Sequence, residues 1–189
     1  MIPVAAPRFD LDECESEAER AFIEAVHARA EDGGWFADAW RVRTGCITLS
    51  VCPSDADSEH NCVLRTLRVD FDGSTVWFGP DETHQFATDL DPSRRGVSVL
   101  SGRPVVELAA AATDWLEREM RRPIARYDWD GPGFRRRLWV LADTGESLVV
   151  SDSANARHRE GLGPPDRIVL VAGRRRDVEQ NAAPDTGPL

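Results

Sequence analysis

The sequence predicts an α+β fold, with two main helices packed against antiparallel sheet in the order helix, three or four strands, helix, four strands. Three observations predict it. An amphipathic stretch lies within residues 101–123, apolar and polar residues alternate over 47–51, and only short loops separate most of the expected strands. Short loops join antiparallel neighbours, because parallel strands need a crossover of about a dozen or more residues.

The first helix is expected over residues 12–31. Its opening turns are rich in glutamate, which suits the positive end of a helix dipole. Ala18, Phe22 and Val26 form a modest apolar stripe. Gly33-Gly34 supplies the stop, since glycine adopts the left-handed conformation of a helix end at little cost.

The second helix is expected between a Ser101 cap and Pro123, with Pro104 in its first turn. A hairpin is expected earlier, where alternating residues from Val63 to Phe71 precede the two-residue turn signal Asp72-Gly73 and a returning strand over 75–78. Further strands are expected at 84–90, 124–129, 136–142, 147–151 and 167–172. Residues 1–10 are interpreted as a flexible arm, 11–172 as a single domain and 173–189 as a disordered tail.

The formal net charge of the 189 residues is -10, and it is uneven. Residues 1–93 hold 19 acidic side chains against 7 Arg, a net charge of -12, whereas residues 94–189 hold 14 against 16, a net charge of +2. Such a field attracts basic proteins and repels nucleic acid and anionic lipid. A basic protein partner is therefore expected, with no nucleic acid and no membrane. The absence of a long apolar run and of a signal peptide predicts a cytoplasmic protein with reduced cysteines.

Asp143-Thr144-Gly145, after an apolar run, resembles the active-site loop of aspartic proteases. In those enzymes two such aspartates share a proton and activate water. One triplet would need a homodimer, and Glu146 stands where that family has a small residue. The same residues are typical of a turn between two strands, which is the favoured interpretation.

Cys46, Cys52, His60 and Cys62 bring metal-binding side chains into one stretch. Zinc needs four such groups in a tetrahedron, but the paired C-x2-C knuckle is missing, and Cys46 and Cys52 would lie about 20 Å apart on an extended strand. No metal or cofactor is therefore expected, and Cys52, His60 and Cys62 are kept as candidates only. His84, beside acidic neighbours, could act as a general base but is more often a surface residue in such a setting.

The stretch from Gly102 to Trp129 holds an amphipathic helix, then Arg122-Pro123, then a short strand. It resembles a segment of actinobacterial immunity proteins from polymorphic toxin systems. The resemblance implies a small, acidic, cytoplasmic α+β domain that binds and blocks a cognate toxin, and it assigns no site residues. The arginine clusters at 121–122, 135–137 and 174–176 are expected to pair with carboxylates and not with nucleic acid.

The leading hypothesis is a non-enzymatic binding protein, immunity-like or adaptor-like, that meets a basic protein partner. Asp55, Asp57 and Glu59 are expected to supply the charge, and Trp35 and Trp40 the apolar anchors. Two alternatives stay open. One is a small hydrolase or metal-dependent enzyme, and the other is a small-molecule binder with a cleft lined by some of the six Trp.

Overall fold

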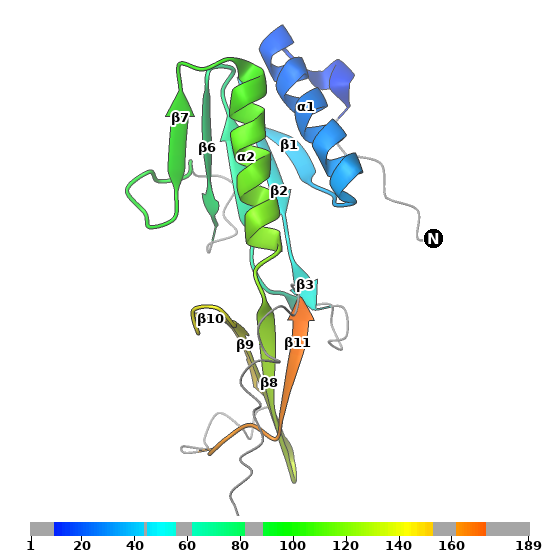
Figure 1. The fold of residues 1–189 in the computed structure, drawn as a ribbon, viewed down its shortest axis with the longest axis vertical. Helices are drawn as coiled ribbons and strands as arrows, with labels where there is room; N and C mark the ends of the chain where they lie inside the picture. Colours follow the sequence, from blue (N-terminus) through cyan, green and yellow to red (C-terminus); the bar gives the residue numbers. More distant parts are fainter. Residues whose placement is uncertain (1–9, 44, 56–61, 82–88, 153–161, 173–189) are drawn as a thin grey trace, which may run out of the picture. The chain divides into compact units, whose positions relative to one another are not determined.

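The computed structural model describes residues 10–43, 45–55, 62–81, 89–152 and 162–172 (Figure 1). The predicted arm and tail lie outside this range, apart from Asp10, and so does most of the strand expected at 84–90. Contacts divide the chain into two compact units, Met1–Met120 and Arg121–Leu189. The sheets of both units are antiparallel and two helices accompany them, which confirms the α+β class.

The first unit is built on a five-stranded sheet with the order β1-β2-β5-β6-β7. Consecutive strands are neighbours, and a separate two-stranded ribbon, β3-β4, interrupts the chain between β2 and β5. The bounds are β1 Asp38–Arg43, β2 Cys46–Val51, β3 Ser54–Asp55, β4 Cys62–Val63, β5 Leu67–Phe71, β6 Thr75–Pro80 and β7 Ser98–Ser101.

Two helices, α1 (Glu17–Gly33) and α2 (Val105–Met120), pack on one face of this sheet (Figure 1). Alternate strand residues point toward them, because successive side chains of a strand face opposite sides. Phe22 of α1 stacks on Phe71 of β5 with ring centroids 4.1 Å apart, and both side chains are fully buried. The apolar core of the unit therefore lies between this face and the helices.

The first helix begins later than predicted because Ser16 caps it. The Ser16 hydroxyl accepts a hydrogen bond from the Glu19 amide at 3.1 Å, and the Glu19 carboxylate accepts one from the Glu15 amide at 2.7 Å. This is a variant of the capping box, which gives partners to amides at the start of a helix. The helix thus begins at Glu17, and the residues before the cap form a short 3-10 turn, η1 Leu11–Glu13.

Glu19 also joins α1 to the sheet. Its two carboxylate oxygens accept hydrogen bonds from the terminal nitrogens of Arg41 in β1, at 3.0 and 2.9 Å, and the residue is 2% exposed. Hydrogen bonding from Arg41 holds the pKa of Glu19 below its usual range. A carboxyl with a pKa lowered by folding adds stability above its unfolded pKa and loses that contribution as the pH falls through the lowered value.

The second helix and the hairpin each differ from the prediction by a few residues. The amides of Glu107 and Leu108 bond to the Pro104 carbonyl at 2.9 and 3.1 Å, so α2 begins at Val105. Ser101, the predicted cap, ends β7 instead. That strand was not predicted, because its mostly exposed residues lack a clear apolar alternation.

The predicted hairpin is formed by β5 and β6, with its turn one position later than expected. The Asp72 amide donates to the Thr75 carbonyl at 3.2 Å, so Gly73 and Ser74 are the two central residues. Gly73 has a φ of 93°, a left-handed conformation that favours glycine. Val63 was expected on the same strand face as Phe71, but it belongs to β4 and is 42% exposed.

The face of the first sheet that turns away from the helices is polar yet buried. Thr48 and Ser50 of β2 and Arg68 and Asp70 of β5 alternate with core positions, and each is at most 5% exposed. Arg68 donates from Nε to Asp70 at 2.8 Å and from a terminal nitrogen to Asp81 at 3.4 Å. These three residues, Arg68, Asp70 and Asp81, are called the Arg68 network.

The second unit is a four-stranded sheet with the order β10-β9-β8-β11. All four strands were predicted, and their bounds are β8 Ile124–Gly131, β9 Phe134–Leu141, β10 Ser147–Asp152 and β11 Arg167–Ala172. Trp139 and Leu141 are buried, whereas Ile168 and Val150 are 61% and 47% exposed. In the part of the chain that the structure describes, no helix has the length and apolar character to cross a bilayer.

We expect Glu19→Gln to lower the free energy of unfolding by about 1–3 kcal/mol at neutral pH, because a shielded, charge-assisted pair is lost. The deficit should shrink below about pH 4, where the wild-type carboxyl begins to take up a proton. Urea unfolding at neutral pH and in acid measures both effects, with the exposed Glu24→Gln as control. A deficit that is equal at both pH values would contradict the role assigned to the Glu19 carboxylate.

Arg68→Met should lower the free energy of unfolding by about 3–5 kcal/mol, because two buried carboxylates lose their guanidinium partner. Arg118→Met removes an exposed arginine from α2 and should cost less than about 0.5 kcal/mol. Urea unfolding of the two variants gives the comparison. Equal losses would mean that the buried charge does not organise the sheet.

Candidate functional site

The acidic loop predicted to meet a partner is only partly described. Asp55 lies in β3 and is 2% exposed, so its carboxylate is not presented to a partner in this structure. Asp57 and Glu59 lie outside the described residues. Asp55 pairs in register with Cys62 of β4.

The two tryptophans predicted as anchors do not form one surface. The Trp35 indole nitrogen donates to Glu117 of α2 at 3.4 Å, and its half-buried ring packs against the apolar core. Trp40 of β1 is opposite Thr48 of β2, which places it on the polar face of the sheet. The two indoles therefore lie on opposite faces of the same sheet.

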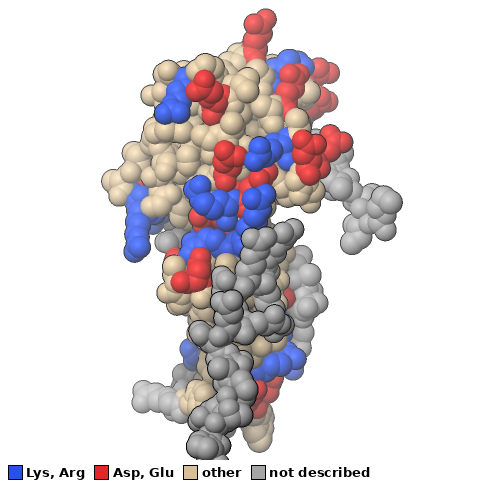
Figure 2. Space-filling view, in the orientation of Figure 1, with Lys and Arg blue, Asp and Glu red and all other residues tan. Residues whose placement is uncertain are grey.

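Exposed carboxylates gather on η1 and α1 instead, as Figure 2 shows. The segment from Asp10 to Gly33 holds nine acidic residues and two arginines, and only Glu19 among the nine is buried. Glu17, Glu24 and Glu31 follow one another at intervals of seven residues, so they lie on one exposed stripe of the helix. We call these three residues the α1 acidic stripe.

The cysteine and histidine residues do not assemble a metal site in the described part of the chain, where no three metal-binding side chains come together. Cys46 is buried, Cys52 is exposed, and His60 and His84 lie outside the described residues. Burial, and then the Asp55 carboxylate, raise the pKa of the Cys62 thiol. A raised thiol pKa disfavours the thiolate form that zinc binds.

Asp143-Thr144-Gly145 forms the predicted turn, between β9 and β10. The Gly145 amide donates to the Leu141 carbonyl at 2.7 Å, and Gly145 has a φ of 72°. The Asp143 carboxylate accepts two hydrogen bonds from Arg122, at 2.8 and 2.9 Å. These bonds hold the pKa of Asp143 below its usual range. An aspartate that is held ionised by arginine is unlike the proton-sharing pair of an aspartic protease.

Arginines in the described part of the predicted clusters pair with carboxylates of the chain. Asp128 of β8 is fully buried, and its oxygens lie 2.8 Å from Arg126, 2.8 Å from Arg167 and 3.4 Å from Arg137. Arg136 lies 3.6 Å from Asp152. These pairs confirm that arginines of the 135–137 cluster and Arg122 of the 121–122 cluster pair with carboxylates of the chain. The cluster at 174–176 lies outside the described residues.

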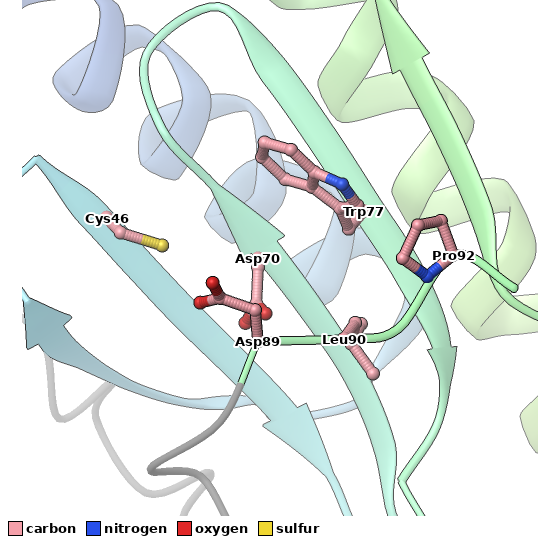
Figure 3. Close-up of a pocket in the computed structure, with 6 residues that line it drawn as sticks. All are labelled: Cys46, Asp70, Trp77, Asp89, Leu90 and Pro92. Atoms are coloured by element: carbon pink, nitrogen blue, oxygen red, sulfur yellow. The ribbon is translucent and has the colours of Figure 1, made fainter. Parts of the chain in front are cut away.

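A cavity of about 180 Å³ opens on the polar face of the first sheet (Figure 3). Strands β2, β5 and β6 provide part of its lining, and the segment that leads to β7 provides another part. Among the described residues, the lining consists of Cys46, Asp70, Trp77, Asp89, Leu90 and Pro92. The cavity thus combines two carboxylates, an indole ring and a buried thiol.

Sequence reasoning did not identify this cavity. The alternation of Thr48 and Asp70 with core residues was visible, but it is typical of a strand whose second face meets water. Trp77 was assigned to a strand with its face undecided. Two features of the tertiary structure bring these groups together. The strand register places Trp77 beside Asp70, and the chain returns to this face at Asp89.

No protein-family model, curated protein or solved structure matches this chain. The resemblance to immunity proteins over residues 102–129 therefore stays a prediction.

We expect Asp143→Asn to change the free energy of unfolding by less than about 1 kcal/mol at neutral pH. The pair with Arg122 is screened by solvent, since the Asp143 side chain is 39% exposed, and asparagine keeps the turn. The small difference should vanish in acid, because a lowered pKa stabilises only above the pH at which the carboxyl is protonated. A loss of several kcal/mol in urea unfolding would show that Asp143 does more than close a turn.

Proposed function

We propose that the protein is a non-enzymatic binding protein, of the immunity or adaptor type, whose partner is a basic protein. The α1 acidic stripe is the observation that supports this proposal most strongly. Its three glutamates are exposed on one side of a helix, in the most acidic part of the chain. The surface that meets the partner is thus assigned to α1, in place of the loop predicted around Asp55.

The stripe has mixed effects on the stability of the helix that carries it. Glu17 is in the first turn, where a negative charge is favourable, and Arg20 lies three residues after Glu17 and four before Glu24, at spacings that favour opposite charges. Glu31 is in the last turn, where the dipole disfavours it, and that turn holds no basic residue. Glu31 is therefore the member of the stripe that the helix itself favours least, and an exposed acidic surface of this kind is well suited to attracting a cationic partner.

The two enzyme alternatives draw no support from the site geometry. The Asp143 carboxylate accepts two hydrogen bonds from Arg122, and the described cysteines do not come together with other metal-binding side chains. A small-molecule binder is favoured by one specific observation, the cavity beside Trp77. The chemistry of that cavity also suits a basic ligand, because two carboxylates and an indole ring line it.

The test uses a fluorescein-labelled nona-arginine peptide as a basic probe. The triple variant Glu17→Gln, Glu24→Gln, Glu31→Gln should slow association with the probe about tenfold at low salt, because steering by an acidic surface raises on-rates by roughly 10-fold or more. The salt dependence of the on-rate should flatten as well. Stopped-flow fluorescence over a series of salt concentrations measures both quantities.

The matched control removes the same number of charges elsewhere, through Glu107→Gln, Glu146→Gln and Asp91→Asn, all of which are exposed. This control should reduce the on-rate much less than the stripe variant. Equal effects of the two triple variants would show that the probe senses net charge alone, and the stripe would lose its assigned role.

A further inference from the structure

One oxygen of Asp70 remains open on the cavity side of the first sheet. Asp70 is 3% exposed, and its Oδ1 accepts hydrogen bonds from the Thr48 hydroxyl at 2.7 Å and from Arg68 Nε at 2.8 Å. Across the described residues, its second oxygen, Oδ2, accepts none. A carboxylate oxygen that is not used within the fold can accept a hydrogen bond from a ligand, and bonds to a charged acceptor are stronger than neutral ones.

The groups around this oxygen favour a cation. Asp89 adds a second carboxylate to the cavity lining, and Figure 3 shows it beside Asp70. Trp77, the cross-strand neighbour of Asp70, adds an indole ring. Cations bind over the faces of aromatic rings, with Trp the most favourable ring. Carboxylates with an indole are the groups that recognise guanidinium and ammonium ions.

The dimensions and the donor set favour an organic cation over a metal ion. The cavity measures about 180 Å³, and an apolar cavity of roughly 150 Å³ is enough to hold benzene. A planar guanidinium with part of its alkyl chain therefore fits. Within the described residues no three metal-binding side chains converge, which leaves a bare divalent ion with too few ligands.

The segment that completes the cavity is held in place by its own hydrogen bonds. Asp91 Oδ1 accepts from the Ser93 amide at 2.8 Å and from the Ser93 hydroxyl at 2.7 Å. The Val97 amide donates to the Arg94 carbonyl at 3.2 Å. Leu90, which is 7% exposed, packs inward beside Asp89. These bonds order the segment that follows Asp89, which lowers the cost of fixing this part of the wall when a ligand binds.

We propose that this cavity binds a guanidinium or ammonium group, with Asp70 and Asp89 as hydrogen-bond acceptors and the Trp77 ring as a flat contact. The proposal deepens the function proposed above, because an arginine side chain of a basic partner is one source of such a group. A free cation of the same chemistry, such as arginine or a polyamine, is the other source. The α1 acidic stripe is on a different element, so the two proposals can fail separately.

The experiment follows the indole N–H signal of Trp77 in two-dimensional 15N NMR spectra, with Trp77→Phe to identify it. The probes are ethylguanidinium, free arginine, spermidine and the blocked tripeptide acetyl-Gly-Arg-Gly-amide. Acetyl-Gly-Gln-Gly-amide is the neutral control. We expect the cationic probes to shift the Trp77 signal in a saturable way, and the neutral peptide to leave it unchanged.

A matched pair of variants separates the site from net charge. Asp89→Asn and Glu107→Gln each remove one exposed carboxylate, and Glu107 of α2 does not line the cavity. Asp89→Asn should weaken binding at least about fivefold, and Glu107→Gln less than twofold, in line with the strength of charge-assisted hydrogen bonds. The spectra themselves report whether each variant is folded.

The results identify the source of the cation and test the cavity site itself. Tighter binding of the arginine tripeptide than of the free cations supports a protein partner as the source, and the reverse order supports a small free cation. No saturable Trp77 shift with any cation, or equal weakening by the two variants, overturns the cavity proposal. If the nona-arginine probe still senses the α1 acidic stripe in that case, the proposed function survives without the cavity.

Discussion

A buried guanidinium at the centre of the first sheet is the constraint on which that unit depends. Arg68 is 2% exposed and holds Asp70 and Asp81 on the face away from the helices. A one-residue slip of β5 would exchange Arg68 for Leu67 or Val69, placing a charge in the apolar core. Buried ion pairs contribute little net stability, but losing one partner is expensive. The Arg68 network therefore acts mainly by favouring one register of β5, and it adds little to the net free energy of folding.

The Arg68 network also bears on the proposed cation site, because Asp70 belongs to both. Asp70 uses one oxygen for the fold, through Arg68 and Thr48, and directs the other to the cavity side. Arg68 and Thr48 already fix the orientation of the Asp70 carboxylate. A ligand that donates to its second oxygen therefore causes little further loss of side-chain freedom. A change at Arg68 would therefore disturb the cavity and the sheet together, whereas Asp89 can be altered without touching the core.

Acidic side chains occur in two settings, and their electrostatic effect acts over a different distance in each. On α1 the carboxylates are exposed, and their field is screened beyond about 10 Å at ordinary salt. In the cavity the Asp70 carboxylate is shielded and Asp89 is exposed beside it, so this pair acts on a group that enters the cavity and contacts them. The first setting speeds the approach of a basic partner, and the second selects a chemical group. The second unit differs, because its buried Asp128 is surrounded by arginines of the same sheet.

The sequence by itself determined the α+β class, the positions of the two helices and the strands at 46–51, 67–80 and 124–172, because these follow from local periodicity and turn residues. It also predicted the Asp143 turn, which depends on neighbouring residues, and that arginines at 121–122 and 135–137 pair with carboxylates, but not with which ones. It misplaced the start of α1, the hairpin turn and the exposure of Asp55. Only the tertiary structure decided which polar residues are buried and which meet at the cavity. Strand register and the returning loop set those distances, and neither leaves a periodic signal in the chain.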